Sequence, residues 1–173
     1  MTSQTSRLIL MLAAFAAGLV LCLSLVLLVV QRPDLPIPQP SAVGGPFKLT
    51  DQEGRTVTEQ DMKGKPFLVF FGFTHCPDVC PTALFDISEV FRKLGSDAGG
   101  ANALFITVDP ERDTVEAMRT YLSSFDPHLR GLTGDEAAID AVVKAYRAYA
   151  KKVPNPDGSY TMDHTALVYL MDK

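Results

Sequence analysis

The sequence predicts an α/β fold with a partly parallel central sheet, preceded by a membrane-spanning helix at the N terminus. Three observations support this prediction. Residues 8–30 are apolar and uncharged, strand-like and helix-like segments alternate after residue 46, and the segments 67–73 and 103–108 are almost continuously apolar. Strands of parallel sheets have this composition because helices cover both faces of the sheet.

Composition limits the classes of protein to which the chain can belong. With 173 residues, 47% of them hydrophobic, the chain is long enough to form one core. The formal net charge of -4 and the pI of about 5.3 argue against a nucleic-acid partner. Cys22 is one of 3 cysteines and lies in the apolar N-terminal run, which leaves a single pair for the folded part. One pair is too few for a disulfide-stapled scaffold and indicates catalytic, redox or metal-binding use.

Residues 1–30 are expected to form an uncleaved membrane anchor. The uncharged run Leu8–Val30 lies between Arg7 and Arg32, and it provides the roughly 20 apolar residues that a membrane span needs. It exceeds the apolar core of a cleaved signal peptide, which has about 7–15 residues. A lipoprotein signal that ends at Cys22 is disfavoured because a bulky leucine precedes this cysteine.

Residues 31–46 are rich in proline and lack apolar periodicity, so we expect them to form an extended linker. The folded domain is then expected to occupy residues 47–173. Its first element should be a hairpin, with strands at 47–49 and 56–58 that are joined by a turn at Asp51–Gly54.

The rest of the domain is expected to alternate strands and helices. The buried strand Phe67–Phe73 is followed by a helix that begins near Pro81 and ends at Gly95, and a second buried strand follows at Ala103–Val108. Asp113 is expected to cap the next helix, with Glu116 as its capping-box partner. The remaining elements are expected to be a strand at 129–132, a helix at 135–150, a polar loop at 151–160 and a strand at 165–171. Strands and helices in this order imply βα crossovers.

The segment Cys76-Pro77-Asp78-Val79-Cys80-Pro81 lies at the predicted turn from a strand into a helix. The N terminus of a helix favours a thiolate over a thiol. Two residues four apart on a helix have Cβ atoms about 5–6 Å apart, whereas a disulfide requires about 3.5–4.5 Å. The spacing therefore favours two sulfurs that share one metal, and it leaves a reversible disulfide open if Cys76 lies outside the helix.

A soft metal bound by two thiolates needs a further ligand, and the chain has 3 histidines. His128 follows a probable turn and is expected to be solvated, while the side chain of His75 is expected to point away from its neighbour Cys76. His164 begins the last predicted strand, and loops at strand ends can meet near the cysteines. A Cys₂His set suits copper and also zinc, so ligand type alone does not distinguish these metals.

Four motifs in consistent order resemble the Sco/SenC (PrrC) family. They are residues 76–81 (CPDVCP), 108–114 (VDPERDT), 131–134 (GLTG) and 163–165 (DHT). The family comprises membrane-anchored, thioredoxin-like copper proteins that are needed for assembly of cytochrome c oxidase. The resemblance implies a thioredoxin-like fold and a copper ion, Cu(I) or Cu(II), that is bound by Cys76, Cys80 and His164. It also implies a further strand and a C-terminal helix after Lys173.

The resemblance further implies a copper metallochaperone that serves the binuclear copper site of cytochrome c oxidase subunit II. The domain would then face the periplasm, or the intermembrane space of a mitochondrion. The stretch before Leu8 is too short for a transit peptide plus an anchor, so we expect the anchor in the bacterial inner membrane and the domain in the periplasm, where a copper donor is a further expected partner. Two alternatives stay open. A membrane-anchored thiol–disulfide oxidoreductase would reduce the oxidase cysteines through Cys76 and Cys80 and would not need His164. A thiol peroxidase would turn over peroxide and hold no stable metal.

Overall fold

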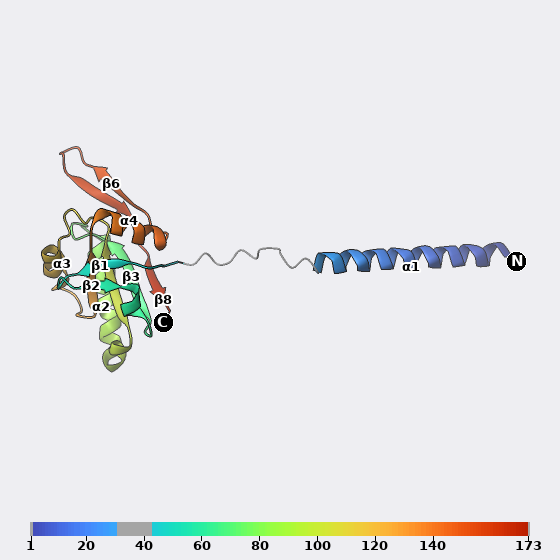
Figure 1. Cartoon of the computed structure of the whole chain (residues 1–173), viewed down its shortest axis with the longest axis horizontal. Helices are drawn as coiled ribbons and strands as arrows, with labels where there is room; N and C mark the ends of the chain where they lie inside the picture. The colour runs from blue at the N-terminus through green and yellow to red at the C-terminus, as the bar shows by residue number, and fades with distance from the viewer. Residues whose placement is uncertain (1, 31–42, 173) are drawn as a thin grey trace. The chain divides into compact units, whose positions relative to one another are not determined.

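The computed structural model describes residues 2–30 and 43–172 of the chain. These residues fall into two compact units that are divided after Ser41. The described part of the N-terminal unit is a single helix, and the C-terminal unit contains the sheets and the helices packed on the main sheet (Figure 1).

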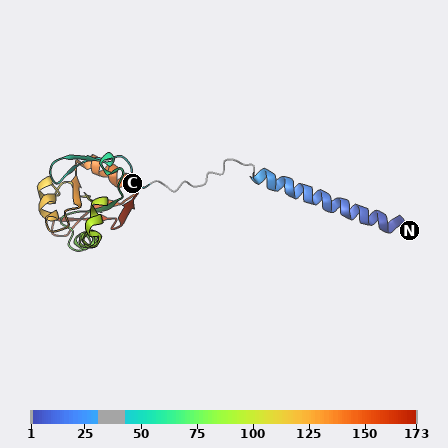
Figure 2. The same ribbon diagram turned by 90° about the horizontal axis from the view of Figure 1, so that it is seen from below.

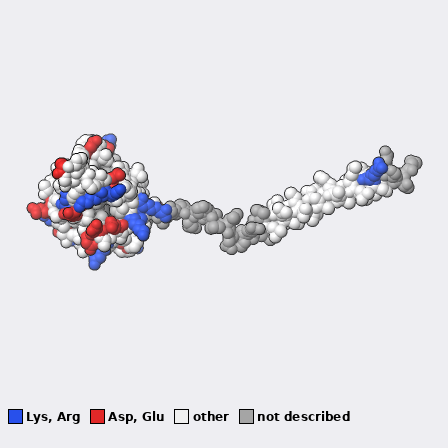
Figure 3. Space-filling view, turned by 90° about the horizontal axis from the view of Figure 1, so that it is seen from above, with Lys and Arg blue, Asp and Glu red and all other residues white. Residues whose placement is uncertain are grey.

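The helix of the N-terminal unit is α1 (Thr2–Val30). Within it, Ser6–Leu28 is long and apolar enough to cross a membrane. Between residues 6 and 28 of this helix the one charged side chain is Arg7, which lies near its beginning (Figure 3). These properties are consistent with the expected membrane anchoring. Most of the predicted linker, residues 31–42, lies outside the described residues.

The C-terminal unit contains all the predicted strands and helices and two further strands. The strands are β1 (Lys48–Asp51), β2 (Thr56–Thr58), β3 (Phe67–Gly72), β4 (Asn102–Thr107), β5 (Leu129–Thr133), β6 (Ala150–Pro154), β7 (Tyr160–His164) and β8 (Val168–Met171). The α-helices are α2 (Val79–Leu94), α3 (Val115–Leu122) and α4 (Glu136–Ala145), and the short 3-10 helices are η1 (Glu59–Met62) and η2 (Gly95–Gly100).

A mixed six-stranded sheet has the order β2-β1-β5-β4-β3-β8. β3, β4 and β5 are parallel, and α2 and α3 form the crossover connections between them. β8 pairs antiparallel with β3, while β1 pairs antiparallel with both β5 and β2. The predicted partly parallel sheet is therefore confirmed, with antiparallel strands at both of its edges.

Neighbouring residues of a strand point to opposite sides of a sheet. Each face of this sheet therefore presents its own set of side chains, and different elements cover the two faces. On one face Phe70 stacks on Phe105 with 6.3 Å between the ring centroids, and Phe105 also contacts Tyr121 of α3. On the other face Phe71 contacts Tyr146, the C-cap residue of α4, and Tyr169 of β8. Figure 2 shows α2 and α4 on opposite sides of the sheet. The sheet is thus covered on both faces, as its composition predicts.

The predicted polar loop at 151–160 is wrong, because this segment contains most of β6 and the beginning of β7, which form an antiparallel ribbon. β6 and β7 pair with each other from Ala150 and His164 at one end to Pro154 and Tyr160 at the other. They form a separate two-stranded sheet (Figure 1). Most ribbon side chains are exposed or half-buried, so no apolar periodicity reveals these strands in the sequence.

The predicted helix at 135–150 is too long. α4 ends at Ala145, and the buried Tyr146 follows as its C-terminal cap residue. Arg147 then adopts φ of 54°, a left-handed conformation that ends helices. The chain leaves α4 at this point and enters β6.

Asp113 does not cap α3, contrary to the prediction. The cap is Thr114, whose Oγ1 accepts the N–H of Ala117 at 3.2 Å. Asp113 is fully buried and accepts the hydroxyl hydrogens of Thr74 and Thr107, each at 2.6 Å. Aspartate and threonine are both favourable cap residues, so the sequence alone does not decide between two adjacent candidates.

Candidate metal centre

The structure brings Cys76, Cys80 and His164 together at one end of the main sheet. Their potential ligand atoms all lie within 4.8 Å of one another, and among the described residues they form the one such group. Cys76 lies in the turn after β3, Cys80 lies in the first turn of α2, and His164 is the last residue of β7. Three separate elements therefore supply one side chain each.

The turn between β3 and α2 determines how the two cysteines approach each other. Cys76 precedes Asp78, the N-cap residue of α2, so the pair does not share a helical surface. The N–H of Cys76 donates to the carbonyl of Phe73 at 3.1 Å, and the N–H of Cys80 donates to Cys76 Sγ at 3.3 Å. The helical separation that disfavours a disulfide does not apply to this pair.

His164 reaches the cysteines from the end of β7 and not, as predicted, from the beginning of the last strand. Its Nε2 lies 3.6 Å from Cys80 Sγ, and its Nδ1 lies 3.1 Å from the carbonyl oxygen of Thr165. Because a carbonyl oxygen only accepts hydrogen bonds, Nδ1 carries the hydrogen and Nε2 offers a lone pair. The imidazole edge also contacts the rings of Phe70 and Phe73, with centroids 6.3 and 5.7 Å away.

Burial favours the thiol form of Cys80. Its side chain is inaccessible to solvent, and this desolvation, together with a hydrogen bond to Cys76, raises the pKa of the Cys80 thiol far above its usual range. Without a metal, desolvation thus opposes the preference for a thiolate that a helix N terminus provides. A metal cation at the site would displace the proton and replace it as the partner of the sulfur.

The spacing of the ligand atoms fits a single metal ion. With metal–ligand bonds of about 2.0–2.3 Å and angles between tetrahedral and trigonal, two ligand atoms lie about 3.5–4.0 Å apart. The 3.6 Å between Cys80 Sγ and His164 Nε2 falls in this range, and the upper limit of 4.8 Å within the group exceeds it only modestly. A small movement of the Cys76 turn would complete a three-coordinate site.

The other two histidines lie outside this group. His75 is exposed, and its Nδ1 lies 4.0 Å from the carboxylate of Asp113. His128 stacks on the ring of Phe91, with 4.9 Å between centroids, and its Nδ1 lies 2.7 Å from the Asp126 carboxylate. The prediction was a solvated His128, but its ring is packed against the domain and is only partly exposed.

Asp113 is a functional candidate that sequence reasoning missed. Its carboxylate accepts the N–H of Thr74 at 3.0 Å, and its carbonyl accepts the hydroxyl of Thr133 at 2.7 Å. The bonds from Thr74 fix the beginning of the turn that carries Cys76. Burial raises the pKa of Asp113, although hydrogen bonds from Thr107 and Thr74 oppose the shift. The one signal in the sequence was its place in the motif 108–114.

A shallow pocket opens over the cysteine pair and gives the site access to solvent. Cys76 and His164 line it, whereas Cys80 lies behind them. Its other walls come mainly from apolar side chains, which include Phe73, Pro77, Val79, Met162 and Ala166. A metal held here would be accessible from one side.

Comparison with known proteins identifies relatives of the chain. A sequence profile of the SCO1/SenC family matches residues 36–173. The structure of ScoI of Bradyrhizobium japonicum with copper bound is 68% identical with a TM-score of 0.74, covering 76% of this chain and 83% of that chain. Yeast Sco1 with copper bound is 40% identical with a TM-score of 0.70, covering 76% of this chain and 74% of that one. The predicted thioredoxin-like fold is confirmed by these Sco structures.

Two mitochondrial relatives show the extent of the match. The SCO1 homolog of Mus musculus is 47% identical over 132 residues, which cover 75% of this chain and 46% of the relative. The SCO1 homolog 1 of Arabidopsis thaliana is 42% identical over 132 residues, covering 76% of this chain and 40% of the relative. The chain thus spans less than half the length of either relative. The family profile nevertheless spans residues 36–173, which include Cys76, Cys80 and His164, and the chain belongs to the SCO1/SenC family.

Proposed function

We propose that the domain binds one copper ion through Cys76 Sγ, Cys80 Sγ and His164 Nε2. The observation that carries this proposal is the convergence of these atoms within 4.8 Å. Thiolates suit Cu(I), and imidazole suits both oxidation states. Related structures at 68% and 40% identity hold copper, which favours copper over zinc for this donor set.

Copper is the cargo of this site, and its acceptor is the binuclear copper site of cytochrome c oxidase subunit II. Two features support transfer. A three-coordinate metal leaves room for an incoming ligand, and the pocket exposes the site beside Cys76 and His164. The helix α1 would hold the domain at the bacterial inner membrane on its periplasmic side, where a copper donor loads it and the oxidase receives the metal.

An anaerobic Cu(I) titration of the full chain in detergent tests the binding. A Cys22→Ser background is used because Cys22 is exposed on α1 and is itself a soft ligand. We expect one tightly bound copper per chain, and a much lower affinity after His164→Ala. His75→Ala is the matched control, since His75 lies beside Cys76 but outside the ligand group. Equal affinities of His164→Ala and the parent chain would refute the assigned ligand set.

A thiol–disulfide oxidoreductase is the second candidate function. It is favoured by one observation, namely that Cys76 lies outside α2, so the cysteines are not held at helical spacing. This reaction needs Cys76 and Cys80 but not His164. Restoration of oxidase activity by His164→Ala, in cells that lack the native protein, would favour the reductase. Failure of this variant to restore oxidase activity, with normal protein levels, would favour copper delivery.

A further inference from the structure

His164 is carried by a ribbon that is not hydrogen-bonded into the main sheet. β6 and β7 form a sheet of their own, and a two-stranded ribbon is only marginally stable by itself. Metal ligands must nevertheless be held within about 0.5 Å of their working positions. Contacts outside the ribbon must therefore fix His164 relative to Cys80.

Arg112, in the loop between β4 and α3, supplies such contacts. Its guanidinium carbon lies 3.8 Å from the centroid of the Tyr160 ring, and its Nη1 donates to the Tyr160 carbonyl at 3.0 Å. Its Nε pairs with the buried carboxylate of Asp109, which also accepts the Tyr160 hydroxyl at 3.0 Å. One guanidinium thereby holds the backbone and, through Asp109, the side chain of the first residue of β7.

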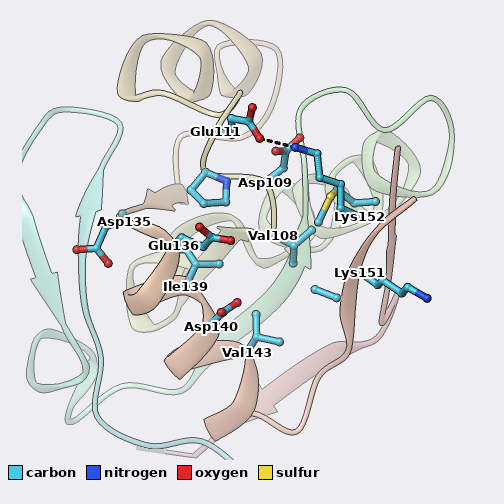
Figure 4. Close-up of a pocket in the computed structure, with 14 residues that line it drawn as sticks. Val108, Asp109, Glu111, Asp135, Glu136, Ile139, Asp140, Val143, Lys151 and Lys152 are labelled. Carbon is cyan, nitrogen blue, oxygen red and sulfur yellow. Dashed lines mark hydrogen bonds and ion pairs between the residues drawn. The ribbon is translucent and has the colours of Figure 1, made fainter. Parts of the chain in front are cut away.

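A second ion pair lies beside this contact but is more exposed. Lys152 of β6 pairs with Glu111 at 2.5 Å (Figure 4). Its Nζ also lies 3.7 Å from the centroid of the Tyr160 ring. The side chains of Lys152 and Glu111 are 49% and 69% exposed, whereas those of Arg112 and Asp109 are 23% and 4% exposed. Exposed ion pairs contribute little, so the attachment depends mainly on Arg112 and Asp109.

The ribbon is not closely packed on its α4 side. A pocket lies there between the ribbon and α4 (Figure 4). Its walls include Ile139, Asp140 and Val143 from α4 and Ala150, Lys152 and Met162 from the ribbon. Met162 also lines the pocket over the cysteines, so β7 runs between two hollows. Packing against α4 therefore leaves the position of β7 incompletely fixed.

The contact at Tyr160 is connected to His164 in two ways. Tyr160 and His164 lie on the same face of β7, because alternate residues of a strand point to the same side and these two are four positions apart. The Arg112 guanidinium also lies 5.8 Å from the Phe73 ring, which in turn meets the His164 imidazole edge-on at 5.7 Å. Arg112 Nη2 is buried with no hydrogen-bond partner among the described residues.

We propose that Arg112 is a positioning residue for the copper site, which holds β7 so that His164 Nε2 lies beside Cys80 Sγ. This inference rests on the proposed copper-binding function. Residues that orient metal ligands typically change metal affinity by about 10- to 100-fold when they are replaced. For Arg112→Gln we expect a loss at the lower end, about tenfold, because Phe70 and Phe73 still contact the imidazole.

A double-mutant cycle on Cu(I) affinity tests the proposal with the full chain in detergent and Cys22→Ser as the background. Arg112→Gln should weaken binding about tenfold when His164 is present and should have no further effect when His164→Ala is also present. It should also alter the imidazole-nitrogen coupling in the electron paramagnetic resonance spectrum of the Cu(II) form. Arg92→Gln is the matched control, because Arg92 pairs with Glu89 on exposed α2 and should leave both readouts unchanged.

The cycle separates failure of this inference from failure of the proposed function. If Arg112→Gln weakens binding equally with and without His164, its effect is general and the positioning role is refuted. If His164→Ala alone binds copper as the parent chain does, the ligand set is refuted, and this inference with it. Should Arg112→Gln fail to fold, Tyr160→Leu removes the ring contact with Arg112 and the hydroxyl contact with Asp109 but keeps the carbonyl contact, and it is judged by the same two criteria.

Discussion

Gly72, the last residue of β3, lies so close to Cys80 that a methyl group added there should displace the thiol. A Cβ on Gly72 would lie 2.7 Å from Cys80 Sγ, 2.7 Å from Phe105 Cε2 and 3.2 Å from Phe70 Cε1. Ordinary contacts begin at 3.4 Å, so the sulfur and the Phe105 ring would each have to withdraw by about 0.7 Å, the difference between 3.4 and 2.7 Å. Neither has free space, because both side chains are completely buried.

Gly72→Ala is therefore expected to lower the free energy of unfolding of the metal-free chain by about 1–3 kcal/mol, the usual cost of overpacking a core. It should also weaken copper binding, since the displacement of Cys80 Sγ exceeds the tolerance of about 0.5 Å for a preorganised site. Chemical denaturation measures the first effect, and an anaerobic Cu(I) competition titration measures the second.

Gly131→Ala is the matched control for overpacking. A Cβ on Gly131 would lie 2.5 Å from Leu122 Cδ1 and 2.8 Å from Met118 Cε, at the contact between β5 and α3. These atoms are the ends of flexible side chains, so we expect a smaller loss of stability and an unchanged copper affinity. Parent-like copper affinity in Gly72→Ala, or an equal loss of affinity in both variants, would refute the reasoning.

Three further predictions concern protons and the cap of α3. Copper affinity should rise about tenfold per pH unit for each thiol proton that is released on binding, because burial keeps Cys80 protonated in the metal-free chain. Competition titrations between about pH 6 and pH 8 measure this, and a copper affinity that does not change with pH would contradict it. Burial raises the folded-state pKa of Asp113 above its usual 3.8. The stability of the parent chain relative to Asp113→Asn should therefore be greatest below pH 3.8 and should decline as the pH rises through the raised pKa. A difference in melting temperature between the two chains that does not vary with pH would count against this. Thr114→Ala should lower the free energy of unfolding by about 1 kcal/mol through loss of the N-cap, whereas Glu116→Ala should be nearly neutral; denaturation curves in the opposite order would contradict the observed cap.

The main sheet and its helices were predictable because burial leaves a pattern in the sequence. β3 and β4 are covered on both faces and are almost entirely apolar, and α2 buries Leu84, Ile87 and Phe91 at helical spacing. The ribbon was not predictable in this way, since its residues are exposed or half-buried and show no apolar periodicity. The Pro156-Asp157-Gly158 sequence was a usable turn signal, and Gly158 does adopt a left-handed φ of 84° between the ribbon strands.

The candidate site was only partly predictable from local sequence. The cysteine pair stood out because two thiols follow a buried strand and enter a helix, but the high pKa of Cys80 depends on complete burial by the surrounding fold. His164 entered the ligand set through family resemblance, since no spacing rule connects it to Cys80. The position of Arg112 depends on its contact with Tyr160 of β7, much later in the chain. The position of Asp113 depends on its contact with Thr74, much earlier in the chain.

X-ray absorption at the copper K edge tests the central claim most directly, because it reports the donor atoms themselves. The sample is the full chain in detergent, with Cys22→Ser, loaded anaerobically with one equivalent of Cu(I). We predict two sulfur donors and one imidazole nitrogen, with the imidazole signal lost in His164→Ala and retained in His75→Ala. A sulfur-only copper site in the parent chain, or an imidazole signal that persists in His164→Ala, would contradict the proposed centre.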